Sequence, residues 1–254
     1  MSETDRESAL FHPSDLALAV GLLTRLPVPV QDATRGSRAA WAWPLAGAVL
    51  GGLSALAGGA AMALGLPAPV AALVALGALV MLSGGLHEDG LADTADGLWG
   101  GWTRQRRLEI MRDSRIGSYG VIALVLSLGL RAVALAPIFA AGALAALAAL
   151  IVAAMVSRAA MAGVMAALPH ARADGLAQAQ GRPPLATVLL AAALASVTAV
   201  ALGGMAGVAA AGAAALAALV VARVAQDRIG GQTGDILGAA QQVAEIAALM
   251  CLLP

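Results

Sequence analysis

Residues 139–157 read FAAGALAALAALIVAAMVS and contain no charged side chain. A transmembrane α-helix needs about 20 consecutive, mainly apolar residues to cross the hydrocarbon core of a bilayer. This segment meets that requirement. Six further segments resemble it in length and composition: 41–65, 68–86, 118–137, 185–203, 205–222 and 236–253. The sequence therefore predicts an all-α, polytopic membrane bundle of about seven transmembrane helices.

The composition of the whole chain agrees with this prediction. Of the 254 residues, 60% are hydrophobic and 12% are charged, and the mean hydropathy is +0.86. Soluble domains contain about 25% charged residues. We expect one transmembrane domain over 1–254 with a polar tail over 1–13, which lacks the features of a signal peptide. The short segment 15–23 is expected to be an interfacial helix, and 159–168 either extends the preceding helix or lies at the interface.

The connections between the apolar segments are of two kinds, uncharged and arginine-rich, and they alternate along the chain. The arginine-rich connections hold every arginine except Arg6 and Arg131, and they are 24–40, 87–117, 158–184 and 223–235. Alternation places them on one side of the membrane, and the positive-inside rule makes that side cytoplasmic. We therefore expect a multi-pass protein of the cytoplasmic (inner) membrane. The net charge of zero gives no reason to expect a nucleic-acid partner.

The most polar segment, SGGLHEDGLADTADGLWGG, covers residues 83–101. Asp89, Asp93 and Asp96 have i, i+4, i+7 spacing, which places them on one face of a helix. The outer two would be about 10 Å apart along the axis, so one ion cannot easily bind all three on a straight helix. Hard oxygen ligands favour Mg²⁺ or Mn²⁺ over Zn²⁺. The alternative is a solvated helical turn at the membrane surface.

An arginine-rich segment, RRLEIMRDSRIGSYG, follows at 106–120 and supplies Arg112, Asp113 and Arg115. Carboxylates that bind a metal and arginines that bind phosphate are the groups that phosphoryl transfer requires. The sequence therefore predicts a cytoplasmic active-site segment over 87–117. His87 is expected to be structural, because no second histidine lies near it in the sequence.

Both segments together resemble the cobalamin (5′-phosphate) synthase family, or adenosylcobinamide-GDP ribazoletransferases. The pieces LLTRLPVPV at 22–30, Trp43-Pro44-Leu45 and GGQTGDILGA at 230–239 resemble other signatures of that family in the same order. The resemblance covers essentially the whole chain. Glu88 stands where the family often has an apolar residue, which argues against Glu88 as an essential ligand, and Ser118 replaces a frequent threonine.

The resemblance implies a Mg²⁺-dependent membrane transferase that joins adenosylcobinamide-GDP to α-ribazole or α-ribazole 5′-phosphate. GMP leaves, and adenosylcobalamin or its 5′-phosphate forms. On this interpretation Asp89, Asp93 and Asp96 hold the metal, and one carboxylate, Asp93 or Asp96, accepts the proton of the attacking hydroxyl. Arg112 and Arg115, with Asp113 beside them, are expected to contact the diphosphate or GMP. The oligomeric state, including a homo-oligomer, stays open.

Two residues outside the acidic segment are further candidates for substrate binding. Asp235 precedes the last apolar segment, where it is either a helix N-cap or a contact for metal or ribazole. Arg25 lies in the TRLPVP motif and is either a substrate contact or a membrane anchor.

The remaining charges in or beside the apolar segments are expected to be structural. Arg131 and Glu245 lie within predicted spans, and intramembrane charges usually face a partner or a cavity. We expect these two to pair with each other, or one of them to line the substrate cavity. Arg158 and Arg223 are expected to anchor helix ends at lipid headgroups.

Two other functions compete with the transferase. A CDP-alcohol phosphotransferase also uses membrane aspartates and a leaving nucleotide, but its acidic motif is more widely spaced than DGLADTADG. A polytopic transporter would carry acids along a path through the spans, whereas here they cluster in one segment.

Overall fold

The computed structural model describes residues 10–30 and 34–254. Within these residues the chain forms helices and no β-strand, and the isolated bridge between His170 and Gln232 is the extended pairing found there. The elements are α2 (Ser14–Leu23), the 3₁₀ helix η1 (Gly36–Ala42), α3 (Trp43–Ala63), α4 (Ala68–Ser83), α5 (Leu86–Gly100), α6 (Arg104–Ile110), α7 (Ser118–Ala140), α8 (Ala143–Ala167), α9 (Leu176–Gln180), α10 (Leu185–Ile229) and α11 (Gly234–Cys251). The predicted all-α class is confirmed.

Several of these helices are suited to cross a membrane. In the described part of the chain four helical stretches are long and apolar enough, namely 36–63, α7, α8 and α10. A fifth span forms if α4 and α5, which meet at a bend of 87°, are counted together. The chain is therefore a multi-pass membrane bundle, but the predicted number of seven spans is not confirmed.

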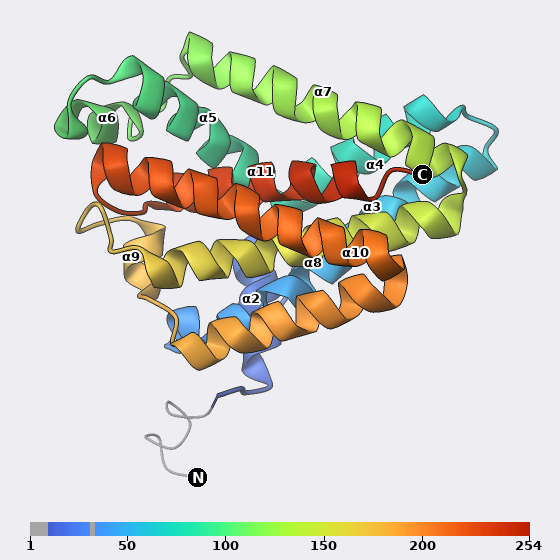
Figure 1. The fold of residues 1–254 in the computed structure, drawn as a ribbon, viewed down its shortest axis with the longest axis horizontal. Helices are drawn as coiled ribbons and strands as arrows, with labels where there is room; N and C mark the ends of the chain where they lie inside the picture. The colour runs from blue at the N-terminus through green and yellow to red at the C-terminus, as the bar shows by residue number, and fades with distance from the viewer. Residues whose placement is uncertain (1–9, 31–33) are drawn as a thin grey trace.

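The difference from seven spans has two physical causes. α10 covers two predicted segments and folds back on itself at Gly204, whose φ of 55° and ψ of −131° are not helical (Figure 1). α11 carries Gln241, Gln242 and Glu245 in its buried interior, so its composition is more polar than that of a simple span. Span counts based on apolar length alone therefore join the two arms of α10 and leave out α11.

The two ends of the bundle differ. The turns after α3 and α7 and the reversal of α10 lie at one end, and α6 and α9 lie at the opposite end (Figure 1). The arginine-bearing α6 therefore lies far from the uncharged turns, as the alternation of loops predicted. α8 continues to Ala167, so the predicted segment 159–168 extends the preceding helix.

The N-terminal helix α2 is held to the bundle by a buried acid. The Asp15 carboxylate accepts hydrogen bonds from Arg35 at 2.5 and 2.9 Å and from the Trp41 indole at 2.7 Å. Asp15 and Arg35 are both buried. This paired and hydrogen-bonded charge fixes the end of α2 against η1.

Close backbone contact holds α3 against α8, the most buried of the candidate spans. A Cβ atom on Gly47 would meet the Ala154 carbonyl oxygen at 2.5 Å, and one on Gly51 would overlap the Leu150 carbonyl. Small residues at such contacts let helix backbones approach closely in lipid.

We expect Gly51→Ala to destabilise the protein by about 1–3 kcal/mol, because its methyl group overlaps the backbone of α8. The neighbouring Gly52 provides the matched control, since no atom lies within 4 Å of a Cβ built there. Gly52→Ala should be neutral or slightly stabilising, because alanine favours a helix over glycine. Unfolding in detergent compares the two variants. Equal stability of both would disprove this packing argument.

Candidate active site

The acidic helix α5 begins at a sharp break after α4. Gly84 and Gly85, with φ of 67° and 68°, adopt the left-handed conformation that favours glycine. The exposed Arg25 lies across this break: its backbone N–H donates to the Leu82 carbonyl at 2.7 Å, and its side chain covers Gly84. Arg25, predicted as a substrate contact or anchor, thus has a local role in shaping the α4–α5 turn.

The predicted helical row of aspartates lies on α5, between α11 and α7. Asp89 is exposed, Asp93 is half-buried and Asp96 is buried. No hydrogen bond or ion pair among the described residues uses the Asp89 carboxylate. The three side chains therefore have different environments although they share one helical face.

Asp96 closes the start of α7. Its carboxylate accepts hydrogen bonds from the backbone N–H groups of Gly117 at 2.7 Å and Gly120 at 2.9 Å. A negative charge is favourable at a helix N-terminus, where backbone donors lack helical partners. The glycines leave room for it, because a Cβ on either one would overlap the carboxylate. The sequence did not reveal this capping role, and the assignment of Asp96 as a metal ligand stays a prediction.

α11 brings another acid to the row. Gly90 on α5 faces Gly238 on α11, and a Cβ on Gly90 would meet the Asp235 carbonyl oxygen at 2.9 Å. Asp93 consequently interacts electrostatically with Asp89, Asp235 and Asp96. Asp235 lies about 140 positions from this row in the sequence, and the close contact of Gly90 with Gly238 brings it beside the row in the fold.

Asp235 is not the N-cap of α11. The Thr233 hydroxyl takes that role by accepting a hydrogen bond from the Ile236 N–H at 3.3 Å. Asp235 follows in the first turn, and its carboxylate pairs with Arg172 at 3.0 Å. The N-cap interpretation of Asp235 is therefore wrong, and its side chain belongs to the acidic row.

Arg172 is a functional candidate that sequence reasoning missed. It is the cation that opposes the acids around Asp93, and its Nη1 atom is buried without a hydrogen-bond partner in the described structure. Its loop is fixed by backbone bonds from Ala171 to Gln232 and from Gln232 to Pro169, each 2.8 Å. No local motif marks Arg172, because the contact with 230–235 forms only in the fold.

The predicted phosphate-binding arginines divide into two groups. Arg112 contacts Asp174 at 2.6 Å, and Asp174 lies 3.9 Å from Arg172, so ion pairs connect Arg112 with Asp235. Arg115 instead pairs with Asp113 at 2.9 Å. The side-chain hydrogen bond from Arg115 lowers the pKa of Asp113. Both members of this second pair are exposed, and neither joins the chain of ion pairs that reaches Asp235.

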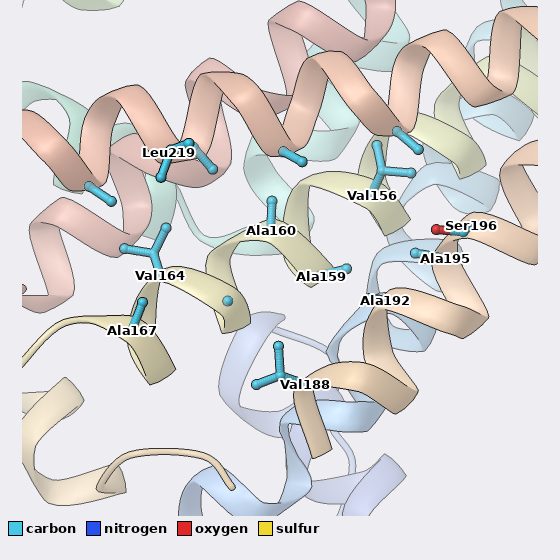
Figure 2. Close-up of a pocket in the computed structure, with 15 residues that line it drawn as sticks. Val156, Ala159, Ala160, Val164, Ala167, Val188, Ala192, Ala195, Ser196 and Leu219 are labelled. Carbon is cyan, nitrogen blue, oxygen red and sulfur yellow. The ribbon is translucent and has the colours of Figure 1, made fainter. Parts of the chain in front are cut away.

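A cavity of about 160 Å³ opens beside the acids. Asp89, Arg172, Asp235 and His87 are among its lining residues. A larger hollow of about 300 Å³ lies between α8 and the two arms of α10 (Figure 2), and its lining includes no ionisable side chain. Of these two cavities, the smaller has side chains suited to catalysis.

The described acids do not form a closed set of ligands for the predicted metal. Among the described residues, no three His, Cys, Asp or Glu side chains are placed to hold one ion. The donor chemistry nevertheless suits Mg²⁺, which usually binds one or two carboxylates, retains water and takes further oxygens from substrate phosphates. Asp89 and Asp93 are free to act in this way, and Asp235 is engaged by one arginine.

A buried charge network lies behind the acidic row. Arg131 contacts Glu88 at 3.0 Å and Glu245 at 3.3 Å, which confirms the predicted Arg131–Glu245 pair. Glu88 faces this network, in agreement with its exclusion from the essential ligands. Arg158 is also fully buried and lies 3.7 Å from Glu245. Its predicted role as a headgroup anchor is wrong, while Arg223 is exposed and pairs with Asp227 at 3.3 Å.

The chain is similar in sequence to proteins of a known family. The sequence profile of the cobalamin-5-phosphate synthase family matches residues 15–253. No solved structure matches the chain.

Three relatives, each named adenosylcobinamide-GDP ribazoletransferase, are 47% identical to this chain. The protein of Bradyrhizobium diazoefficiens aligns over 93% of this chain and 92% of its own length. The corresponding values are 94% and 95% for Azorhizobium caulinodans, and 94% and 96% for Brucella canis. With nearly the whole length matched, the chain belongs to the cobalamin-5-phosphate synthase family.

Proposed function

We propose that this protein joins adenosylcobinamide-GDP to α-ribazole or its 5′-phosphate, with release of GMP. The product is adenosylcobalamin or its 5′-phosphate. The observation that carries the proposal is the meeting of Asp89, Asp235 and Arg172 at one cavity, with Asp93 close enough to interact electrostatically with all three. The names of the relatives support the same reaction.

The chemistry is a displacement at phosphorus. A secondary ribose hydroxyl, which is free in both α-ribazole and its 5′-phosphate, is the nucleophile: its oxygen forms a bond to the phosphorus attached to cobinamide, and the bond from that phosphorus to the oxygen of GMP breaks. The hydroxyl proton passes to a carboxylate, for which half-buried Asp93 is suited by its position among other acids. Arg172 supplies positive charge beside the acids, which favours binding of a diphosphate, and Arg112 becomes a second such contact if the substrate displaces Asp174 from it.

Magnesium is part of the proposal. Asp89 and Asp93, with Asp235 beside them, would hold Mg²⁺ together with oxygens of the substrate diphosphate. When bound, the ion supplies charge neutralisation for the diphosphate and the leaving phosphate. Without a cation, three carboxylates would repel the same anionic substrate, so substrate binding itself favours this arrangement.

The location is proposed from the loop charges. The arginine-rich connections share one side by alternation, and positive loops are retained in the cytoplasm. The protein would then lie in the cytoplasmic (inner) membrane with its acidic row facing the cytoplasm. In a variant whose native Cys251 is replaced by serine, a cysteine introduced at exposed Gln105 should react with an impermeant reagent only after the membrane is opened.

Metal removal gives the direct test of this function. Purified protein with adenosylcobinamide-GDP, α-ribazole and Mg²⁺ should form adenosylcobalamin and GMP in equal amounts. EDTA should stop both, because the carboxylates alone cannot neutralise the diphosphate, and excess Mg²⁺ should restore them. Product formation in EDTA would refute the requirement for Mg²⁺. Absence of GMP in the presence of Mg²⁺ would refute the proposed transfer reaction.

Asp235 should contribute to the reaction and not to the helix start. Asp235→Asn is expected to lower the transfer rate by about 10–100-fold, the usual effect of removing a group that supports a metal site. The free energy of unfolding of this variant should change little, because the N-cap of α11 is Thr233 and not Asp235. Asp227→Asn, an exposed acid at the end of α10, serves as the control. Unchanged initial rates in Asp235→Asn would remove Asp235 from the site.

A further inference from the structure

The cavity beside the acids has two chemically different parts. Asp89, Arg172 and Asp235 give it charged groups from α5, the 168–175 loop and the start of α11. The remaining lining is mainly apolar and includes Leu22 and Leu23 of α2, Trp43 of α3, Met161 and Met165 of α8, and Ala177 of α9. A cavity with this lining suits a ligand that has one apolar and one anionic or hydroxylated part.

The volume restricts which part of a substrate can enter. Pockets for drug-sized ligands have volumes of about 300–1,000 Å³, whereas this cavity has about 160 Å³. A single fused aromatic ring system fits such a space, and a cobinamide macrocycle does not. Trp43 and the two methionines are favourable neighbours for a flat ring, because aromatic and thioether groups pack well on aromatic faces.

One buried polar group in the lining has no partner. His87 is 2% exposed, and its Nε2 atom makes no hydrogen bond in the described structure. This atom is closed off from the open space of the cavity, so a ligand reaches it only if the imidazole ring turns. A buried polar atom without a hydrogen bond is costly, so a ligand that supplies one after such a turn is favoured. A neutral imidazole nitrogen can donate to or accept from a heteroaromatic ring nitrogen.

We propose that this cavity holds the azole base of α-ribazole, with the ribose directed toward Asp89 and Asp235. The proposal rests on the function proposed above and names the place of one of its two substrates. It also assigns a role to α2, whose leucines form part of the wall and whose end is fixed by Asp15. The base would lie among apolar groups while the reacting hydroxyl stays at the acids.

The test fills the cavity from its α9 side. Ala177→Leu places a larger side chain in the lining, and Ala179→Leu, an exposed position on the same short helix, is the matched control. Ala177→Leu should raise the KM for α-ribazole by at least about tenfold, with the KM for adenosylcobinamide-GDP unchanged. An increase confined to adenosylcobinamide-GDP, or no increase, would overturn the proposal.

A second pair of variants tests the contact with His87. His87→Phe keeps a flat ring but removes the nitrogen, and His87→Gln restores a polar group that can hydrogen-bond. Weaker α-ribazole binding in the Phe variant, with recovery in the Gln variant, would support the proposal, and equal affinity in both would contradict it. Equilibrium binding of α-ribazole to the intact protein needs no turnover. Failure of the transfer reaction is thereby distinguished from failure of this binding site.

Discussion

Asp89→Asn is expected to lower the transfer rate by about 10²–10³-fold, the size of effect seen when one electrostatic contact to a transition state is lost. Asparagine has nearly the shape of aspartate, but it lacks the charge needed to bind Mg²⁺. Asp89 is exposed and makes no hydrogen bond or ion pair within the described residues, so its replacement should leave the fold intact. Initial rates of GMP release in Mg²⁺ measure the effect.

Glu109→Gln is the control for the Asp89 variant. Glu109 is an exposed acid on α6 that contacts Gln105 and Arg106, and it lies outside the acidic row. It should keep normal turnover, and both variants should elute as folded protein in detergent. Near-normal GMP release by Asp89→Asn would show that Asp89 is only a solvated acid at the membrane surface, as the alternative that the sequence left open requires.

The sequence predicted those features that depend on local pattern. Apolar runs identified the long helices, and the i, i+4, i+7 spacing identified the helix that carries Asp89, Asp93 and Asp96. The cost of burying a charge in an apolar segment was enough to predict that Arg131 and Glu245 would meet.

Features that depend on contact between distant segments could not be predicted in this way. Arg172 reaches Asp235 because the 168–175 loop pairs with Gln232, and nothing in its neighbourhood in the sequence signals that pairing. Asp96 looked equivalent to Asp89, yet the approach of α7 gives it two backbone donors. Arg158 looked like the end of a span, but α8 continues beyond it and buries it.

Arg131→Met should cause the largest loss of stability of the substitutions considered. The network of Glu88, Arg131, Glu245 and Arg158 contains two positive and two negative charges, so it is neutral as a group. Removal of Arg131 leaves two buried carboxylates with one cation. Breaking a buried ion pair in this way costs about 3–5 kcal/mol, because an uncompensated charge stays inside the protein. Thermal or denaturant unfolding in detergent measures the loss.

Two further variants separate the charge effect from the loss of packing. Glu88→Gln added to Arg131→Met restores neutrality and leaves Arg158 beside Glu245, so it should recover part of the lost stability. Arg223→Met removes an exposed arginine paired with Asp227 and should change stability by about 0–1 kcal/mol. If Arg131→Met were as mild as Arg223→Met, the network would not be holding α5, α7 and α11 together. Glu88 directly precedes Asp89 on α5, so the network can also hold the acidic row in place. If Arg131→Met loses transfer activity, and the double variant regains stability but not transfer activity, the network positions the acidic row.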